Sequence, residues 1–167
     1  MRIKYLTLSA LFAALIFISI TFFHIPNGFG GVIHFGDGII FMAAVILPFP
    51  YAIPAAAIGA GMFNLVRVPI WLPFTIVIKP LLTLCFTSKN DKILGETRNV
   101  MGPFVGLVLN TGLYFFANWF LFDQYTAIAA APGLLIQGGG SIVIFFVLAF
   151  ALDKVGFKAR LKKEGIL

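Results

Sequence analysis

The stretch Trp71-Leu-Pro-Phe-Thr-Ile-Val-Ile-Lys79-Pro-Leu-Leu-Thr-Leu-Cys-Phe86 is apolar enough to span a membrane, and it carries a lysine near its centre. A lysine at such a position costs roughly 2.5–3.5 kcal/mol on insertion scales unless it faces protein, water or a partner. Lys79 therefore indicates either a substrate pathway or a structural ion pair. The obvious partner in the other apolar segments is Asp37.

The composition is that of an integral membrane protein. Of the 167 residues, 60 % are hydrophobic and 11 % are charged, and the mean hydropathy is +1.04. A soluble domain of this size could not cover so much apolar side chain with polar surface. No small-residue cleavage site follows the first apolar stretch, so we expect it to be retained as a span. The lone Cys85 excludes an internal disulfide and is expected to be a small core residue.

Gly, Pro and charge clusters divide the chain into candidate spans at about 5–23, 37–49, 52–66, 72–87, 101–122 and 133–152. With the N-terminus in the cytoplasm, every Lys and Arg except Arg67 and Lys79 falls in an inside segment. The positive-inside rule therefore predicts an all-α integral membrane protein, a six-transmembrane-helix bundle with both termini cytoplasmic. We expect one membrane domain, residues 1–167, whose basic surface meets lipid or a cytoplasmic partner and no nucleic acid.

Two features of this outline suggest room for a ligand on the external side. The second and third spans are short, about 14 residues each, which is tolerated when a bundle leaves a vestibule above them. The external segments 26–31, 67–71 and 123–132 are rich in Gly and Pro or carry aromatic residues, and we expect them to be loops. Such loops suit a lid or a binding rim.

Polar residues recur at helical spacing in the last three spans. They are Trp71, Thr75, Lys79 and Thr83 in the fourth, Asn110, Tyr114 and Asn118 in the fifth, and Gln137 and Ser141 in the sixth. Residues four apart share a helix face, so each helix carries a polar stripe. The stripes could surround a hydrated binding cavity, or they could hold the helices together by hydrogen bonds. We favour the cavity because amides, a phenol and a lysine exceed what packing requires.

Further candidates lie at the ends of spans. Asp37 could cap the second span, pair with the buried lysine, or contact a substrate at the rim. His34 is the more plausible substrate contact of the two histidines, and too few ligand-type residues lie nearby to predict a metal site. Asn64, Arg67 and Trp71 could anchor the bundle at the outer interface or hold a planar heterocycle. The sequence has no catalytic constellation, so neither an enzyme nor a cofactor is expected.

Three segments point to a known family. They are Gly31–Ala44, which contains His-Phe-Gly-Asp-Gly-Ile-Ile, the stretch Trp71–Lys79, and the pair Ala10 and Ala14 on the first span. The chain resembles the substrate-binding S component of an energy-coupling factor (ECF) vitamin transporter. The resemblance covers nearly the whole chain and is greatest to the branch named for riboflavin, which includes carriers of pyridoxine-like and hydroxymethylpyrimidine-like compounds. A His-Phe before Gly36 and a Pro after Lys79 depart from the family pattern.

The resemblance implies a six-helix bundle in the plasma membrane of a prokaryote that binds a vitamin near its outer face. It also implies that small residues of the first span, Ala10, Ala13 and Ala14, dock on a transmembrane coupling subunit that joins two cytoplasmic ATPases. The S component itself hydrolyses nothing. Taken together, the resemblance and the polar stripes give these candidate substrate-binding residues: Asn27, His34, Asp37, Asn64, Arg67, Trp71, Thr75, Lys79, Asn110, Tyr114, Asn118 and Gln137.

Two other classes of function compete with this interpretation. A non-transporting scaffold of cell-wall synthesis, like the small rod-shape membrane protein, would have a similar size and span number but would need no ligand cavity. A stand-alone carrier or membrane enzyme would be expected to show internal repeats or a catalytic constellation. Polar stripes toward the external side argue against the scaffold.

Overall fold

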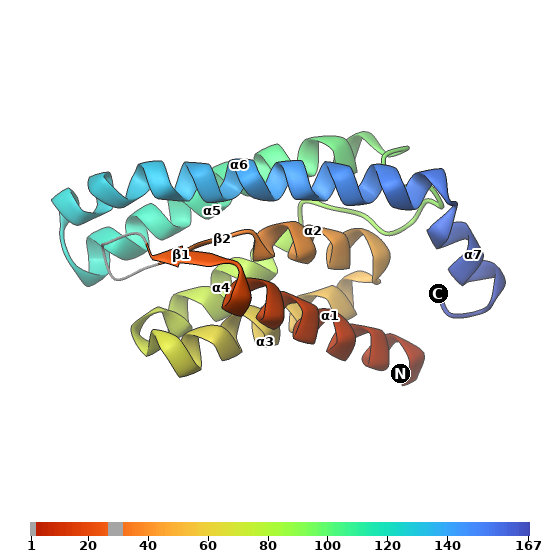
Figure 1. The fold of residues 1–167 in the computed structure, drawn as a ribbon, viewed down its shortest axis with the longest axis horizontal. Helices are drawn as coiled ribbons and strands as arrows, with labels where there is room; N and C mark the ends of the chain where they lie inside the picture. The colour runs from red at the N-terminus through yellow and green to blue at the C-terminus, as the bar shows by residue number, and fades with distance from the viewer. Residues whose placement is uncertain (1–2, 27–31) are drawn as a thin grey trace.

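The computed structural model describes residues 3–26 and 32–167, which are mostly helical (Figure 1). The elements are α1 (Ile3–Phe22), β1 (His24–Pro26), β2 (Val32–His34), α2 (Gly36–Ile46), α3 (Phe49–Arg67), the 3-10 turn η1 (Pro69–Trp71), α4 (Leu72–Thr83), α5 (Thr97–Leu121), α6 (Gln124–Lys154) and α7 (Phe157–Lys163). The short strands β1 and β2 pair antiparallel, with His24 opposite His34. They carry the chain from α1 back into the bundle.

The helices differ in their ability to cross a membrane. Among the described residues, four helices are long and apolar enough to do so, namely α1, α3, α5 and α6. Helix α2 has 11 residues and is only about 16 Å long, against about 30 Å for the hydrocarbon core of a bilayer. Helix α6 has 31 residues, about 46 Å, and extends along the whole bundle (Figure 1). The apolar helices fit a membrane protein, in which α2 is too short to cross the hydrocarbon core by itself.

Helix α2 is the core of the bundle. All of its residues except Ile39 are buried, and it lies between α6 on one side and α1 and α3 on the other (Figure 1). A helix that is apolar all round is found in a protein core or facing lipid, and the burial of α2 places it in the core. Because Asp37 lies in the first turn of this helix, the fold carries a carboxylate to the middle of the bundle.

The third span was predicted too short. Helix α3 has 19 residues, with Pro50 in its first turn and Pro54 inside it. A proline in the first turn removes an N–H that has no helical partner in any case. Pro54 lies only one turn further on, so α3 starts before both prolines.

The prediction of an external loop at residues 123–132 is also wrong. These residues form the first turns of α6, in which Asp123 is the N-cap and its Oδ1 accepts the N–H of Thr126 at 2.7 Å. Pro132 lies within the helix. Neighbouring helices in a membrane bundle support such an interruption, which an isolated helix would not tolerate as well.

Helix α1 packs on α3 through small residues. The Ser9 hydroxyl donates to the carbonyl of Tyr51 at 2.8 Å, and Ala13 is 7 % exposed. A Cβ added to Gly59 would lie 2.6 Å from the Ala13 carbonyl oxygen, so the two backbones are in close contact. Ala13 therefore belongs to the interior of the bundle. Ala10 and Ala14 lie on the exposed face and are the docking candidates that remain accessible.

Gly59→Ala is expected to destabilise the protein by about 1–3 kcal/mol, because the new methyl group would press on the backbone of α1. Gly139→Ala is the matched control. A Cβ there would meet no atom of the described residues within 4 Å, and alanine favours a helix by up to about 1 kcal/mol. Thermal unfolding in detergent should show a lower midpoint for the first variant only. Equal midpoints would mean that the α1–α3 contact yields easily.

The two ends of the chain lie at the same end of the bundle (Figure 1). The Lys4 ammonium donates to the carbonyl of Gly165 at 2.6 Å. The carboxylate of Asp153 accepts the N–H groups of Ile93 and Leu94 at 2.7 and 2.8 Å, which fastens the loop between α4 and α5 to the end of α6. The segments that carry most of the basic residues therefore meet at one end of the bundle.

The buried side chain of Lys158 in α7 allows a test of how α7 packs against the bundle. It is 2 % exposed, and its Nζ donates to the carbonyl of Val45 at 2.8 Å. Burial, with the nearby Lys162 cation, lowers the pKa of Lys158 from 10.5 to about 8. The unfolded chain then holds this proton to a higher pH than the folded chain does. Lys158 therefore contributes stability that increases as the pH rises from the folded pKa toward the unfolded one.

The expected result is a pH-dependent difference between the wild type and Lys158→Met. The difference in melting temperature should shift in favour of the wild type between about pH 7 and about pH 9.5. Using the difference cancels groups that titrate alike in both proteins. A difference that stays constant over this range would contradict the lowered pKa.

Candidate functional site

Asp37 and Lys79 form an ion pair in the middle of the bundle. The Nζ of Lys79 lies 2.7 Å from Oδ1 of Asp37, and each side chain is 2 % exposed. Helix α2 shows no side-chain cap at its N-terminus, so the capping role considered for Asp37 is wrong. The pairing with Lys79 is confirmed, and it explains how a lysine can occupy an apolar segment.

Two amide side chains complete the coordination of this pair. Lys79 Nζ donates to Oδ1 of Asn110 at 2.9 Å, and Nε2 of Gln137 donates to Oδ2 of Asp37 at 2.9 Å. The same ammonium lies 4.9 Å from the centre of the Tyr114 ring. Helices α2, α4, α5 and α6 therefore meet at one polar point, and the predicted stripes do face one another. Satisfying a buried charge pair with added hydrogen bonds reduces its desolvation penalty.

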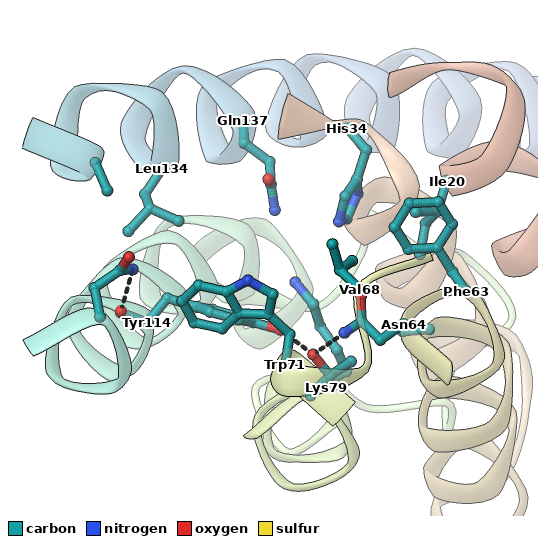
Figure 2. Close-up of a pocket in the computed structure, with 14 residues that line it drawn as sticks. Ile20, His34, Phe63, Asn64, Val68, Trp71, Lys79, Tyr114, Leu134 and Gln137 are labelled. Carbon is teal, nitrogen blue, oxygen red and sulfur yellow. Dashed lines mark hydrogen bonds between the residues drawn. The ribbon is translucent and has the colours of Figure 1, made fainter. Parts of the chain in front are cut away.

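A cavity lies beside this network (Figure 2). Its lining includes the end of α3, the start of α4 and the end of α5, which lie at the end of the bundle opposite the two termini (Figure 1). The space open to the centres of water molecules is about 60 Å³, enough for several waters or the edge of a compact ring. Eight of the predicted binding residues line it: His34, Asn64, Trp71, Thr75, Lys79, Tyr114, Asn118 and Gln137. They come from β2, η1 and the helices α3 to α6, so segments far apart in the sequence build the site together.

The other four predicted residues do not line this cavity. Asp37 and Asn110 lie behind its wall, where they hold Lys79. Arg67 is exposed at the end of α3, which agrees with the interfacial anchor considered for it. Asn27 lies outside the described residues.

The sequence reasoning missed the apolar part of the lining. These residues are Ile20, Ala60, Phe63, Val68, Ala130 and Leu134. Ala130 and Leu134 lie seven and three residues before Gln137, which is the spacing of one helix face. Leu134 lay within the predicted sixth span and could have been found by following this face from Gln137, whereas Ala130 lay in the segment predicted to be a loop.

Hydrogen bonds inside the wall fix the orientation of two amides. The Nδ2 of Asn118 donates to the carbonyl of Tyr114 at 2.8 Å, and the Nε2 of Gln137 donates to Asp37. A carbonyl or a carboxylate can only accept, so the nitrogen of each amide is identified by its partner. Each amide then has its carbonyl oxygen and its second N–H left for a ligand.

The imidazole of His34 is oriented in the same way. Its Nδ1 accepts the N–H of Gly36 at 3.2 Å, so the neutral ring carries its proton on Nε2. Burial lowers the pKa of His34 to about 4. The ring is therefore a neutral donor beside the cavity, into which it points in Figure 2.

Aromatic rings and hydroxyls form the remaining wall. The centre of the Trp71 ring lies 5.9 Å from that of Tyr114 and 6.0 Å from that of Phe122. The Tyr114 hydroxyl lies 2.7 Å from that of Thr75, which also accepts a hydrogen bond from Nδ2 of Asn64. This wall offers a planar ligand an aromatic surface. Its rings are fixed by contacts with Phe122 and Thr75.

Comparison with known proteins agrees with this architecture. Residues 1–154 match the family described as "ECF-type riboflavin transporter, S component". The matched segment runs from α1 to the end of α6 and includes every residue that lines the cavity. No curated protein matched the chain. Because the match covers most of its length, the chain belongs to the family of S components of ECF-type riboflavin transporters.

Proposed function

We propose that the protein binds a small heterocyclic vitamin or vitamin precursor, such as riboflavin, pyridoxine or hydroxymethylpyrimidine, at the outer face of a prokaryotic cell membrane. The observation that carries this proposal is the cavity, which combines aromatic rings, oriented amides and a paired lysine in a subunit of this transporter family. Ligand sites typically combine an apolar lining with a few convergent polar groups. The heterocycle would lie against Trp71 and Tyr114, with Asn64, Asn118 and Gln137 at its edges.

The proposed topology has six transmembrane segments built on α1 to α6, and cytoplasmic termini. In it, the short helices α2 and α4 cross the membrane together with the segments that flank them. The two termini, near which many of the basic residues lie, are at the same end of the bundle. The cavity then opens toward the outside, where a vitamin would enter. The bound vitamin would be delivered to the cytoplasm after the exposed face of α1 that carries Ala10 and Ala14 docks on a transmembrane coupling subunit. That subunit would be linked to two cytoplasmic ATPases. Small residues on such a face let another helix approach closely.

The decisive experiment is to identify the ligand. The protein would be purified in mild detergent and denatured, and any released small molecule would be analysed by mass spectrometry. We expect a heterocycle at close to one molecule per protein, and its depletion in an Asn118→Leu variant that is still folded. An empty preparation that no vitamin stabilises against heat, together with co-purifying cell-wall enzymes, would support the scaffold instead.

A further inference from the structure

We propose that Asp37 determines the charge selectivity of the site, so that it accepts an uncharged ring and rejects carboxylate or phosphate derivatives of the same ring. The inference rests on the proposed function, since it concerns which ligands enter that cavity. Asp37 itself does not line the cavity. It acts through the side chains of Lys79 and Gln137, which it holds by hydrogen bonds, and is therefore a positioning residue.

The charge of the cavity wall favours a neutral ligand. Its ionisable lining residues, among those the structure describes, are His34, Lys79 and Tyr114. The histidine is neutral, and a phenol is neutral near physiological pH. Lys79 brings the positive charge, and the carboxylate of Asp37 lies 2.7 Å from it. The net charge of the cavity lining together with Asp37 is therefore zero. An anionic ligand would bring a negative charge without a counter-ion.

Such an unpaired charge is strongly unfavourable in a buried site. Taking an ion out of water still costs several kcal/mol after relaxation, unless a free opposite charge awaits it. Lys79 has three N–H donors, of which Asp37 and Asn110 take two. The third can serve a neutral acceptor, such as a ring nitrogen or a carbonyl, but the positive charge is already compensated.

The orientation of the two amides supports the same preference independently of the net charge. Asp37 takes the N–H of Gln137, and the Tyr114 carbonyl takes that of Asn118. Each amide therefore offers a ligand an oxygen whose identity is fixed, beside the second N–H of its nitrogen. An amide oxygen pairs with an N–H or O–H group of a ligand, whereas it would face the oxygens of a carboxylate or phosphate unfavourably. The amino, ring N–H and hydroxyl groups of an unphosphorylated heterocycle fit this pattern.

The test uses pairs of ligands that match in size but differ in charge. Pyridoxine, hydroxymethylpyrimidine and riboflavin each carry a CH₂OH group that can be replaced by a carboxylate. Affinities would be measured by isothermal titration calorimetry on the detergent-purified protein. For the ring that binds, we expect the neutral member to bind at least about 100-fold more tightly than the carboxylate.

Variants of Asp37 separate charge from shape. In Asp37→Asn the Lys79 cation loses its counter-ion, so the preference for the neutral ligand should fall at least about 10-fold. In the double variant Asp37→Asn/Lys79→Met the site is uncharged again, and the wild-type preference should return. The double variant removes both charges, so it tests the idea even if the single variant folds poorly.

The possible failures are distinguishable. Tight binding of the carboxylate by the wild type would overturn the inference while leaving the proposed function intact. The same conclusion would follow if the ligand preference of Asp37→Asn equalled that of the wild type, or if the double variant preferred the anion. If neither member of any pair bound, the vitamin-binding function and the selectivity inference would both fall.

Discussion

Replacing Lys79 with methionine is expected to lower the free energy of unfolding by about 3–5 kcal/mol, because it leaves the Asp37 carboxylate buried without its partner. The ammonium also donates to Asn110, so the variant loses a second hydrogen bond in the same place. Few other single substitutions on the described surface or in the loops should approach this magnitude. Equilibrium unfolding in mixed micelles, followed by tryptophan fluorescence, would measure the loss.

The double variant Asp37→Asn/Lys79→Met is the control for this prediction. It removes both charges, while the asparagine can still accept the N–H of Gln137. Replacing a whole buried ion pair is often close to neutral, whereas breaking one is not. We therefore expect the double variant to recover most of the lost stability. If it proved as unstable as Lys79→Met, the cost would come from packing around position 79 and not from the unpaired charge.

The sequence made the pairing of Asp37 with Lys79 one of the roles expected for the aspartate, because the signals are local. A lysine in an apolar stretch requires a partner, and Asp37 was the candidate at comparable depth. The spacing of Asn110, Tyr114 and Asn118 places them on one helix face whatever the tertiary structure. Such constraints hold within a single helix, and the structure brings the faces together as predicted.

The rotation of each helix about its axis was harder to predict. In a soluble protein the polar face of a helix shows which side is buried. Helix α1 is apolar on all sides, because its outer face meets lipid, so the sequence did not reveal that Ala13 faces inward while Ala10 and Ala14 face outward. The start of α6 was missed for a related reason. A proline and several small residues indicate a loop in water, but packing against α5 stabilises them as helix.

The ion pair and the cavity depend on each other through α2. This helix is too short to cross a bilayer, and so its first turn brings Asp37 to the base of the cavity. A longer second helix would place the carboxylate nearer the surface, where water would screen it. The short helix therefore creates both the space for a ligand and the need for the lysine.

Trp71→Ala is expected to weaken binding of the vitamin by at least about 30-fold, equivalent to about 2 kcal/mol, which is the usual loss when a buried aromatic contact residue is truncated. Trp71 is 6 % exposed and lines the cavity beside Tyr114. The matched control is Trp119→Ala on α5. Trp119 is 47 % exposed and stacks on Phe116 away from the cavity lining, so its loss should leave the affinity unchanged.

The two tryptophans of the chain also allow a direct optical test of the same contact. In Trp119→Phe the remaining indole is Trp71, and a heterocycle that stacks on it should change its fluorescence as the site fills. In Trp71→Phe the remaining indole is Trp119, and the signal should stay constant while calorimetry still reports binding. A saturable change in the second protein and none in the first would place the ligand against the outer aromatic residues of α5, and the cavity would lose its role as the binding site.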